Sequence, residues 1–88
     1  METTLTIHHP VGLHARPASI FVQTAKKFSS KISICMDDKQ VNAKSILNIL
    51  ALGADQGSVI RLVVEGDDEE AALKALTELV ESNFGGVD

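Results

Sequence analysis

The chain has 88 residues, the size of one small domain, and 44% of them are hydrophobic, enough to build a core. Its net charge is −4 and its eight Lys and Arg residues are spread along the sequence, so nucleic acid is not an expected partner. One cysteine and the lack of any long apolar stretch predict a single cytoplasmic domain over residues 1–88, with no disulfide and no membrane insertion.

The first half of the chain alternates between the periods of strands and helices. Hydrophobic and polar residues alternate over 3–8, which predicts a half-buried strand. Residues 17–28 change to helical spacing, with one apolar stripe and two lysines near the end. Alternation returns over 31–36, and the polar turn 37–39 predicts a hairpin with a shorter strand over 40–43.

The second half predicts a short helix, a strand and a long helix. Ser45 is expected to be the N-cap of a helix over 46–52. Residues 59–65 predict a strand, and the acidic run 67–70 predicts the first turn of a helix that the glycines at 85 and 86 end. The order is βαββαβα. Strands with one apolar face favour an open-faced α+β sandwich, with a four-stranded antiparallel sheet and three helices on one face.

The stretch GLHARPAS, residues 12–19, places a histidine and an arginine where the first helix begins. Pro17 is favoured in the first turn of a helix, so His14 is expected at or just before the N-cap. The free N–H groups and the positive end of the helix dipole there disfavour a protonated imidazole and attract an anion, and Arg16 adds a charged donor. Gly12 allows the turn that brings His14 to the surface, and Ala18 starts the buried stripe of the helix.

This arrangement suits a covalent phosphoryl carrier. One nitrogen of a neutral imidazole attacks a phosphoryl group, and backbone N–H groups and arginine hold the phosphoramidate that forms. The alternative from the residues alone is that His14 only caps the helix and that Arg16 is solvated.

Two motifs resemble those of a known family. GLHARPAS resembles the active-site signature of HPr, the histidine-containing phosphocarrier family of the bacterial phosphoenolpyruvate:sugar phosphotransferase system, and VNAKSILNILALGADQG, residues 41–57, is similar to its second signature. The resemblance covers nearly the whole chain and implies the same open-faced fold. It implies that His14 is phosphorylated on Nδ1, that Arg16 stabilises the phosphoryl group and that Ser45 matches a regulatory serine. It implies no cofactor and no stand-alone enzyme activity.

The resemblance also implies partners. His14 would accept the phosphoryl group from Enzyme I and pass it to sugar-specific IIA domains. A member regulated at Ser45 would also meet HPr kinase/phosphorylase and a catabolite-control regulator, although Ser45 as an N-cap has a structural use of its own. We expect a monomer. The alternatives are a regulatory binding module of this fold, whose members tend to lose the histidine, a carrier of the nitrogen-related branch, and a small-molecule-binding α+β domain.

The short helix has more hydrophobic residues than one buried face can hold. If Ile49 and Leu52 pack on the sheet, the other apolar side chains are exposed and form a patch for partner docking. On the first helix, one isoleucine lies opposite the buried stripe and is also expected to face solvent. The expected docking residues are Ile20, Ile46, Leu47 and Leu50. The alternative is that Leu47 and Leu50 lie under neighbouring loops.

The remaining candidates predict no metal site. His8 and His9 are interpreted as surface histidines at a strand end, because no second pair of ligands accompanies them. Cys35 is expected to be a packed or half-exposed strand residue. Three departures from the family pattern are Val11, where a polar residue is common, the additional imidazoles of His8 and His9, and a hairpin turn without its usual glycine.

Overall fold

The computed structural model describes residues 1–87, and in this part of the chain it has four strands and four helices. In chain order they are β1 (Glu2–Thr6), α1 (Ala15–Ala25), β2 (Lys31–Met36), β3 (Lys39–Asn42), α2 (Ile46–Leu52), β4 (Val59–Glu65), α3 (Glu69–Glu81) and α4 (Asn83–Gly86). The expected βαββαβα order is therefore confirmed, with one short helical segment added at the end.

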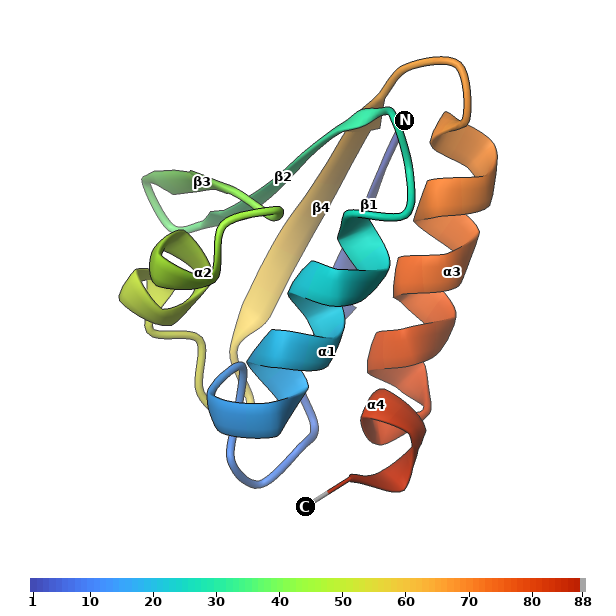
Figure 1. Ribbon diagram of the computed structural model, residues 1–88. Helices are drawn as coiled ribbons and strands as arrows, with labels where there is room; N and C mark the ends of the chain where they lie inside the picture. Colours follow the sequence, from blue (N-terminus) through green and yellow to red (C-terminus); the bar gives the residue numbers. More distant parts are fainter. Residues whose placement is uncertain (88) are drawn as a thin grey trace.

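The four strands form one antiparallel sheet in the order β1-β4-β2-β3. Along β4, Ile60, Leu62 and Val64 are buried and the residues at both ends are exposed, so the sheet has one apolar face. Helices cover that face and leave the other open, with α1 and α3 side by side and α2 next to β3 (Figure 1). The predicted open-faced α+β sandwich is confirmed. No helix within residues 1–87 has the length and hydrophobicity that crossing a bilayer requires.

The core lies between this face of the sheet and the helices. It is built mainly from aliphatic side chains, with two phenylalanines. Its largest fully buried members are Phe21, Ile7, Leu13, Ile32, Ile34, Ile49, Leu52, Ile60, Leu62, Leu76, Val64 and Phe84. Because Leu13 is the residue before His14, the core anchors the loop that carries the histidine.

Several element boundaries differ from the expected ones. β1 ends at Thr6, α1 begins at Ala15 and ends at Ala25, and β3 begins one residue early, at Lys39. The acidic run is divided, because α3 begins at Glu69 and the residues before it belong to the turn. Of these, Asp68 uses its carboxylate to bind the loop between α1 and β2 and does not cap its own helix.

The C-terminal end corrects the expectation of three helices. α3 ends at Glu81, ahead of the two glycines that were expected to stop it. Asn83 and Phe84 take positive φ angles of 54° and 59°, which turn the chain back and form α4. The reversal buries Phe84, which is 2% exposed, in the hydrophobic core. Burial of this aromatic side chain offsets the backbone strain.

Candidate functional site

His14 is the N-cap of α1, as the position of Pro17 predicts. Its backbone is extended, with φ −134° and ψ 169°, and its side chain makes no capping hydrogen bond. Ala15 and Arg16, the first two helical residues, have N–H groups without a carbonyl partner inside the helix, and Pro17 has no N–H. The imidazole, about a third exposed, therefore precedes a helical turn with two free N–H donors. Arg16 itself is exposed on that turn.

The backbone next to His14 is strained. Ala15 has a φ of 51°, in the left-handed region where a side chain costs about 1 kcal/mol or more. The segment is held on its N-terminal side, where the N–H of Leu13 donates to the Ala54 carbonyl at 2.7 Å. It is held on its C-terminal side by the burial of Pro17. These two anchors fix the turn from which the imidazole extends.

Gly12 does more than permit a turn. Its φ is 78°, and a Cβ there would lie 2.7 Å from the Ala54 carbonyl oxygen and 2.7 Å from the Cα of Asp55. Any other residue would push apart the loop before α1 and the loop between α2 and β4. Gly12 thus brings a segment more than 40 residues away in the sequence against the histidine loop.

Asp55 is a site residue that the sequence analysis missed. One of its carboxylate oxygens, Oδ1, lies 3.1 Å from Nε2 of His14. A carboxylate can only accept, so the ring nitrogen that faces it carries the proton. In the neutral imidazole, the other ring nitrogen, Nδ1, then has the free lone pair. Nothing in the local spacing of Asp55 points to this contact, because it depends on the packing of two distant loops.

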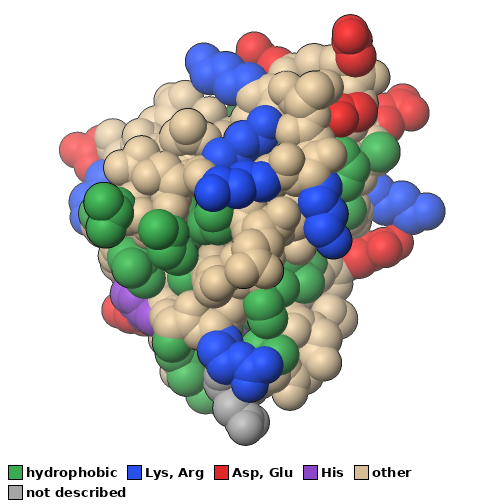
Figure 2. Space-filling model, in the orientation of Figure 1, with side chains coloured by type: hydrophobic (Ala, Val, Ile, Leu, Met, Phe, Trp, Pro, Cys, Tyr) green, Lys and Arg blue, Asp and Glu red, His purple; other side chains and the backbone are tan. Residues whose placement is uncertain are grey.

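One face of α2 is exposed and apolar. On α2, Ile49 and Leu52 are fully buried, whereas Leu47 is 75% exposed, which confirms the predicted two faces of this helix. Figure 2 shows hydrophobic side chains gathered on this side of the molecule, with a histidine and acidic atoms at their edge. We call this area the α2 patch, and it consists of Ile46, Leu47 and Leu50.

Ile20 corrects one expectation. It is half-buried, although its helical position opposite the core stripe predicts full exposure. Elsewhere on the molecule α1 packs against α2 and α3, so the spacing of residues along α1 alone does not fix how exposed each of its outer positions is. Ser45 has the predicted position as the N-cap of α2, and its Oγ accepts a hydrogen bond from the N–H of Asn48 at 3.4 Å.

His9 corrects another expectation, because it is buried and only 4% exposed. Its Nδ1 accepts from the N–H of Val11 at 3.1 Å, and its Nε2 contacts the Val87 carbonyl at 2.5 Å. A carbonyl only accepts, so Nε2 carries the proton. His9 therefore connects the histidine loop to the C-terminal segment. His8 is exposed, and Cys35 is buried on its strand, both as expected.

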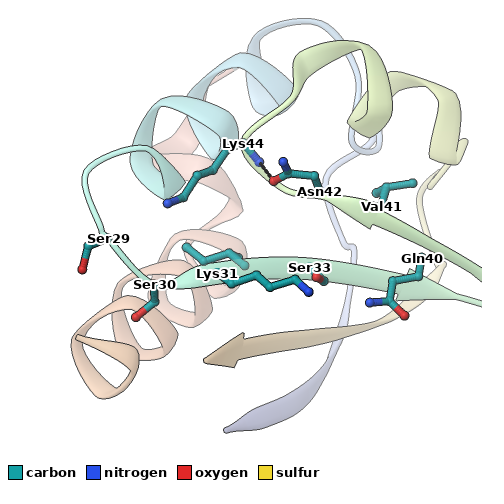
Figure 3. A pocket seen from close by; sticks show the side chains of 9 residues that line it. Ser29, Ser30, Lys31, Ser33, Gln40, Val41, Asn42 and Lys44 are labelled. Atoms are coloured by element: carbon teal, nitrogen blue, oxygen red, sulfur yellow. Dashed lines mark hydrogen bonds between the residues drawn. The ribbon is translucent and has the colours of Figure 1, made fainter. Parts of the chain in front are cut away.

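A polar hollow lies at the far end of α1. Its volume is about 490 Å³, and its lining includes Lys31, Gln40 and Lys44 (Figure 3). The ammonium of Lys44 already donates to the Phe28 carbonyl at 2.7 Å. Ser29, after the C-terminal end of α1, is also part of the lining, so the hollow and the N-terminal His14 are separate features. Within residues 1–87, no three His, Cys, Asp or Glu side chains come together to hold a metal ion.

Comparison with known proteins decides the family. A family model described as "PTS HPr component phosphorylation site" matches residues 1–82. The chain belongs to the HPr family. The phosphocarrier protein HPr of Xylella fastidiosa (strain Temecula1) is 44% identical over 84 residues, 96% of this chain and 94% of that protein. The HPr-like protein Crh of Halalkalibacterium halodurans is 44% identical over 81 residues, 92% of this chain and 96% of that protein.

A solved structure supports the same assignment. The crystal structure of HPr-C-His from Thermoanaerobacter tengcongensis has a TM-score of 0.96 and 57% sequence identity, and covers 100% of this chain and 99% of that one. HPr is a phosphocarrier of the phosphotransferase system and not a stand-alone enzyme, and membership of the family gives this chain that role.

Proposed function

We propose that this protein, as one domain over residues 1–88, carries a phosphoryl group on Nδ1 of His14. It accepts the group from Enzyme I and passes it to sugar-specific IIA domains. The observation that carries the proposal is the position of His14 at the N-cap of α1, with Nε2 turned toward Asp55 and a helical turn that offers the N–H groups of Ala15 and Arg16. The family assignment supports the same role.

The transfer needs a nucleophile and an anion site. The Nδ1 lone pair forms a bond to phosphorus, while the donor's bond to phosphorus breaks and its electron pair leaves with the donor. The N–H groups of Ala15 and Arg16, at the positive end of α1, offer donors to the phosphoryl oxygens. The guanidinium of Arg16 supplies a charge-assisted hydrogen bond, the stronger kind. The second transfer, to a IIA domain, is the same step with the protein as donor.

The α2 patch is the proposed docking surface for both partners, together with the exposed part of Ile20. The opposite face of α2 is fully buried and already anchors the helix in the core. A helix with only a structural role does not need these additional apolar side chains on its surface. Regulation is proposed at Ser45, which is adjacent to Ile46 at the start of the same helix. HPr kinase/phosphorylase and a catabolite-control regulator are the partners proposed for that state. The working form is proposed to be a monomer.

The deciding experiment is phosphorylation by phosphoenolpyruvate, Mg²⁺ and a compatible Enzyme I. One phosphate should be added, and it should be lost in mild acid and kept in base, as in a phosphoramidate. His14→Ala should abolish labelling and keep the fold, because His14 is not part of the hydrophobic core. His8→Ala is the matched control and should label normally, since His8 is exposed on the same loop. Acid-stable phosphate, or labelling of His14→Ala, would contradict the proposal.

A further inference from the structure

We propose that Asp55 is a positioning residue for phosphoryl transfer, acting on the ring of His14. Its carboxylate accepts the hydrogen bond from Nε2–H and so holds the imidazole in the tautomer whose Nδ1 is free to attack. The inference rests on the proposed function of His14, and it adds a residue outside the GLHARPAS stretch, from the loop between α2 and β4.

The backbone around Asp55 is fixed before any partner binds. The N–H of Asp55 donates to Ser58 Oγ at 3.0 Å, and the N–H of Ser58 donates back to the Asp55 carbonyl at 3.0 Å. Ile7, just after β1, exchanges hydrogen bonds with this turn, accepting from Gly57 at 2.7 Å and donating to Ser58 at 2.9 Å. The turn that presents the carboxylate is therefore attached to the sheet.

The loop of His14 is attached to the same turn. Leu13 donates its N–H to the Ala54 carbonyl, and Gly12 lies so close that a Cβ there would collide with Asp55 itself. The residues directly before Asp55 and directly before His14 are thus bonded to each other. Nε2 of His14 and Oδ1 of Asp55 lie 3.1 Å apart on two backbone segments that are already joined. The hydrogen bond between them therefore costs little conformational entropy, because only a few side-chain torsions have to be ordered.

The carboxylate of Asp55 is also expected to stabilise the phosphorylated form of His14. When Nδ1 bonds to phosphorus, the proton stays on Nε2 and the ring acquires a positive charge. The negative charge of Asp55 faces that protonated edge and stabilises the charged ring. Nδ1 is on the other side of the ring from the contact, so the carboxylate does not occupy the place of the phosphoryl group. Asp55 is 77% exposed, and a pair this exposed changes a rate or an equilibrium by roughly two- to fivefold.

The test uses the full-length protein with ¹⁵N-labelled histidine. Ring-nitrogen chemical shifts in NMR spectra distinguish a protonated nitrogen from a bare one. In the wild type, Nε2 of His14 should be protonated and Nδ1 bare. Asp55→Ala should raise the population with a proton on Nδ1 and slow phosphoryl acceptance from Enzyme I by roughly two- to fivefold. Asp55→Asn keeps an amide oxygen that accepts the hydrogen bond, so it should restore the tautomer and part of the rate.

Asp67→Ala is the matched control, because it removes the same charge from an exposed aspartate at the opposite end of β4. It should change neither the ring shifts nor the rate. An unchanged His14 spectrum in Asp55→Ala would overturn the inference, even with a slower rate, since the effect would then come from a partner contact. A changed spectrum with an unchanged rate would also overturn it. Failure of the wild type to accept phosphate would contradict the proposed function itself, while the spectrum would still report the hydrogen bond.

Discussion

At the scale of single residues, one carboxylate outside the site has a defined structural role. Asp68 accepts hydrogen bonds from Ser30 Oγ and from the N–H groups of Ser29 and Ser30, the latter two at 2.9 Å. The Ser30 hydroxyl, followed by the Ser29 N–H, lowers the pKa of Asp68 to about 2 from its usual 3.8. These hydrogen bonds connect the loop before β2 to the start of α3.

This lowered pKa predicts a specific acid sensitivity. The stabilisation by Asp68 should be complete above about pH 4, where the carboxyl is ionised in both the folded and the unfolded state. It should disappear as the pH falls to about 2, because the carboxyl then takes up a proton in the folded state as well. Asp68→Asn should therefore have a lower urea midpoint than the wild type at neutral pH, and the difference should shrink at about pH 2. Asp67→Asn, the exposed neighbour, should show no such difference. A constant difference across this range would contradict the ionic role of Asp68.

The proposed role of Arg16 gives a second prediction at this scale. Arg16→Ala should still be phosphorylated, because the two backbone N–H groups of the first turn of α1 remain. Phosphoryl transfer should slow by about tenfold or more, the effect of losing one charged hydrogen bond. Rapid-quench measurement of the acceptance rate checks this. Lys26→Ala, which removes an exposed cation at the other end of α1, is the control and should transfer like the wild type.

At the scale of elements, α2 divides its hydrophobic residues between the core and the surface. It has only seven residues, from Ile46 to Leu52, and both Ile49 and Leu52 are fully buried. Leu47 is 75% exposed on the other side. A mutation on each side therefore separates the stability of the fold from the docking of partners.

Alanine substitutions on the two sides should have opposite consequences. Ile49→Ala should lower the free energy of unfolding by about 2–4 kcal/mol, because it leaves a cavity in the core. Leu47→Ala should change stability by less than about 0.5 kcal/mol. It should nevertheless raise the KM for this protein in the Enzyme I reaction by at least about threefold, if Leu47 is a contact in the interface. Chemical denaturation and steady-state kinetics measure the two effects, and an unchanged KM would remove Leu47 from the docking surface.

Ser45, at the start of the same helix, gives a further prediction. Ser45→Asp should fold, since aspartate is also a good N-cap, and should accept phosphate from Enzyme I more slowly because it adds a negative charge beside the α2 patch. Ser45→Ala separates the two roles: it should lose about 1 kcal/mol of stability with the cap but transfer normally. Unchanged kinetics of Ser45→Asp at both low and moderate salt would argue against regulation by charge at this position.

At the scale of the whole molecule, two distant segments contact the loop that carries His14. The loop before α1 contacts the loop between α2 and β4 through Leu13 and Ala54. The same loop contacts the C-terminal segment through His9 and Val87, which are 78 residues apart. α4 contacts α1, and Figure 1 shows it near the end at which α1 begins. The loop that carries His14 is therefore held by one segment from the middle of the chain and by one from its C-terminal part.

Loss of the buried histidine should loosen this assembly. His9→Ala leaves the Val11 N–H and the Val87 carbonyl without their partner and removes the ring from its edge-on contact with Phe84. The free energy of unfolding should fall by about 2–3 kcal/mol. Amide hydrogen exchange should increase at residues 83–87 and at Val11. His8→Ala, on the exposed neighbour, should be close to wild type, and equal stability of the two variants would contradict the structural role of His9.

The sequence by itself determined the features that depend on neighbouring residues. The strands over 31–36 and 59–65 and the helix over 46–52 have the predicted bounds, because hydrophobic period and capping residues act within a few positions. Pro17 placed the helix start, and with it the position of His14 at the N-cap. His14 and Arg16 could therefore be predicted as site residues from the sequence.

The tertiary structure alone decided which distant residues complete the site. Asp55 is 41 residues from His14, and no local pattern marks it as a partner of the imidazole. The burial of His9 likewise depends on a distant segment, the C-terminal turn with Phe84 and Val87. The hydrophobic period predicts only on which face of its own helix or strand a residue lies. Which other element covers that face depends on the packing of the whole chain, since long-range contacts form only when the core closes.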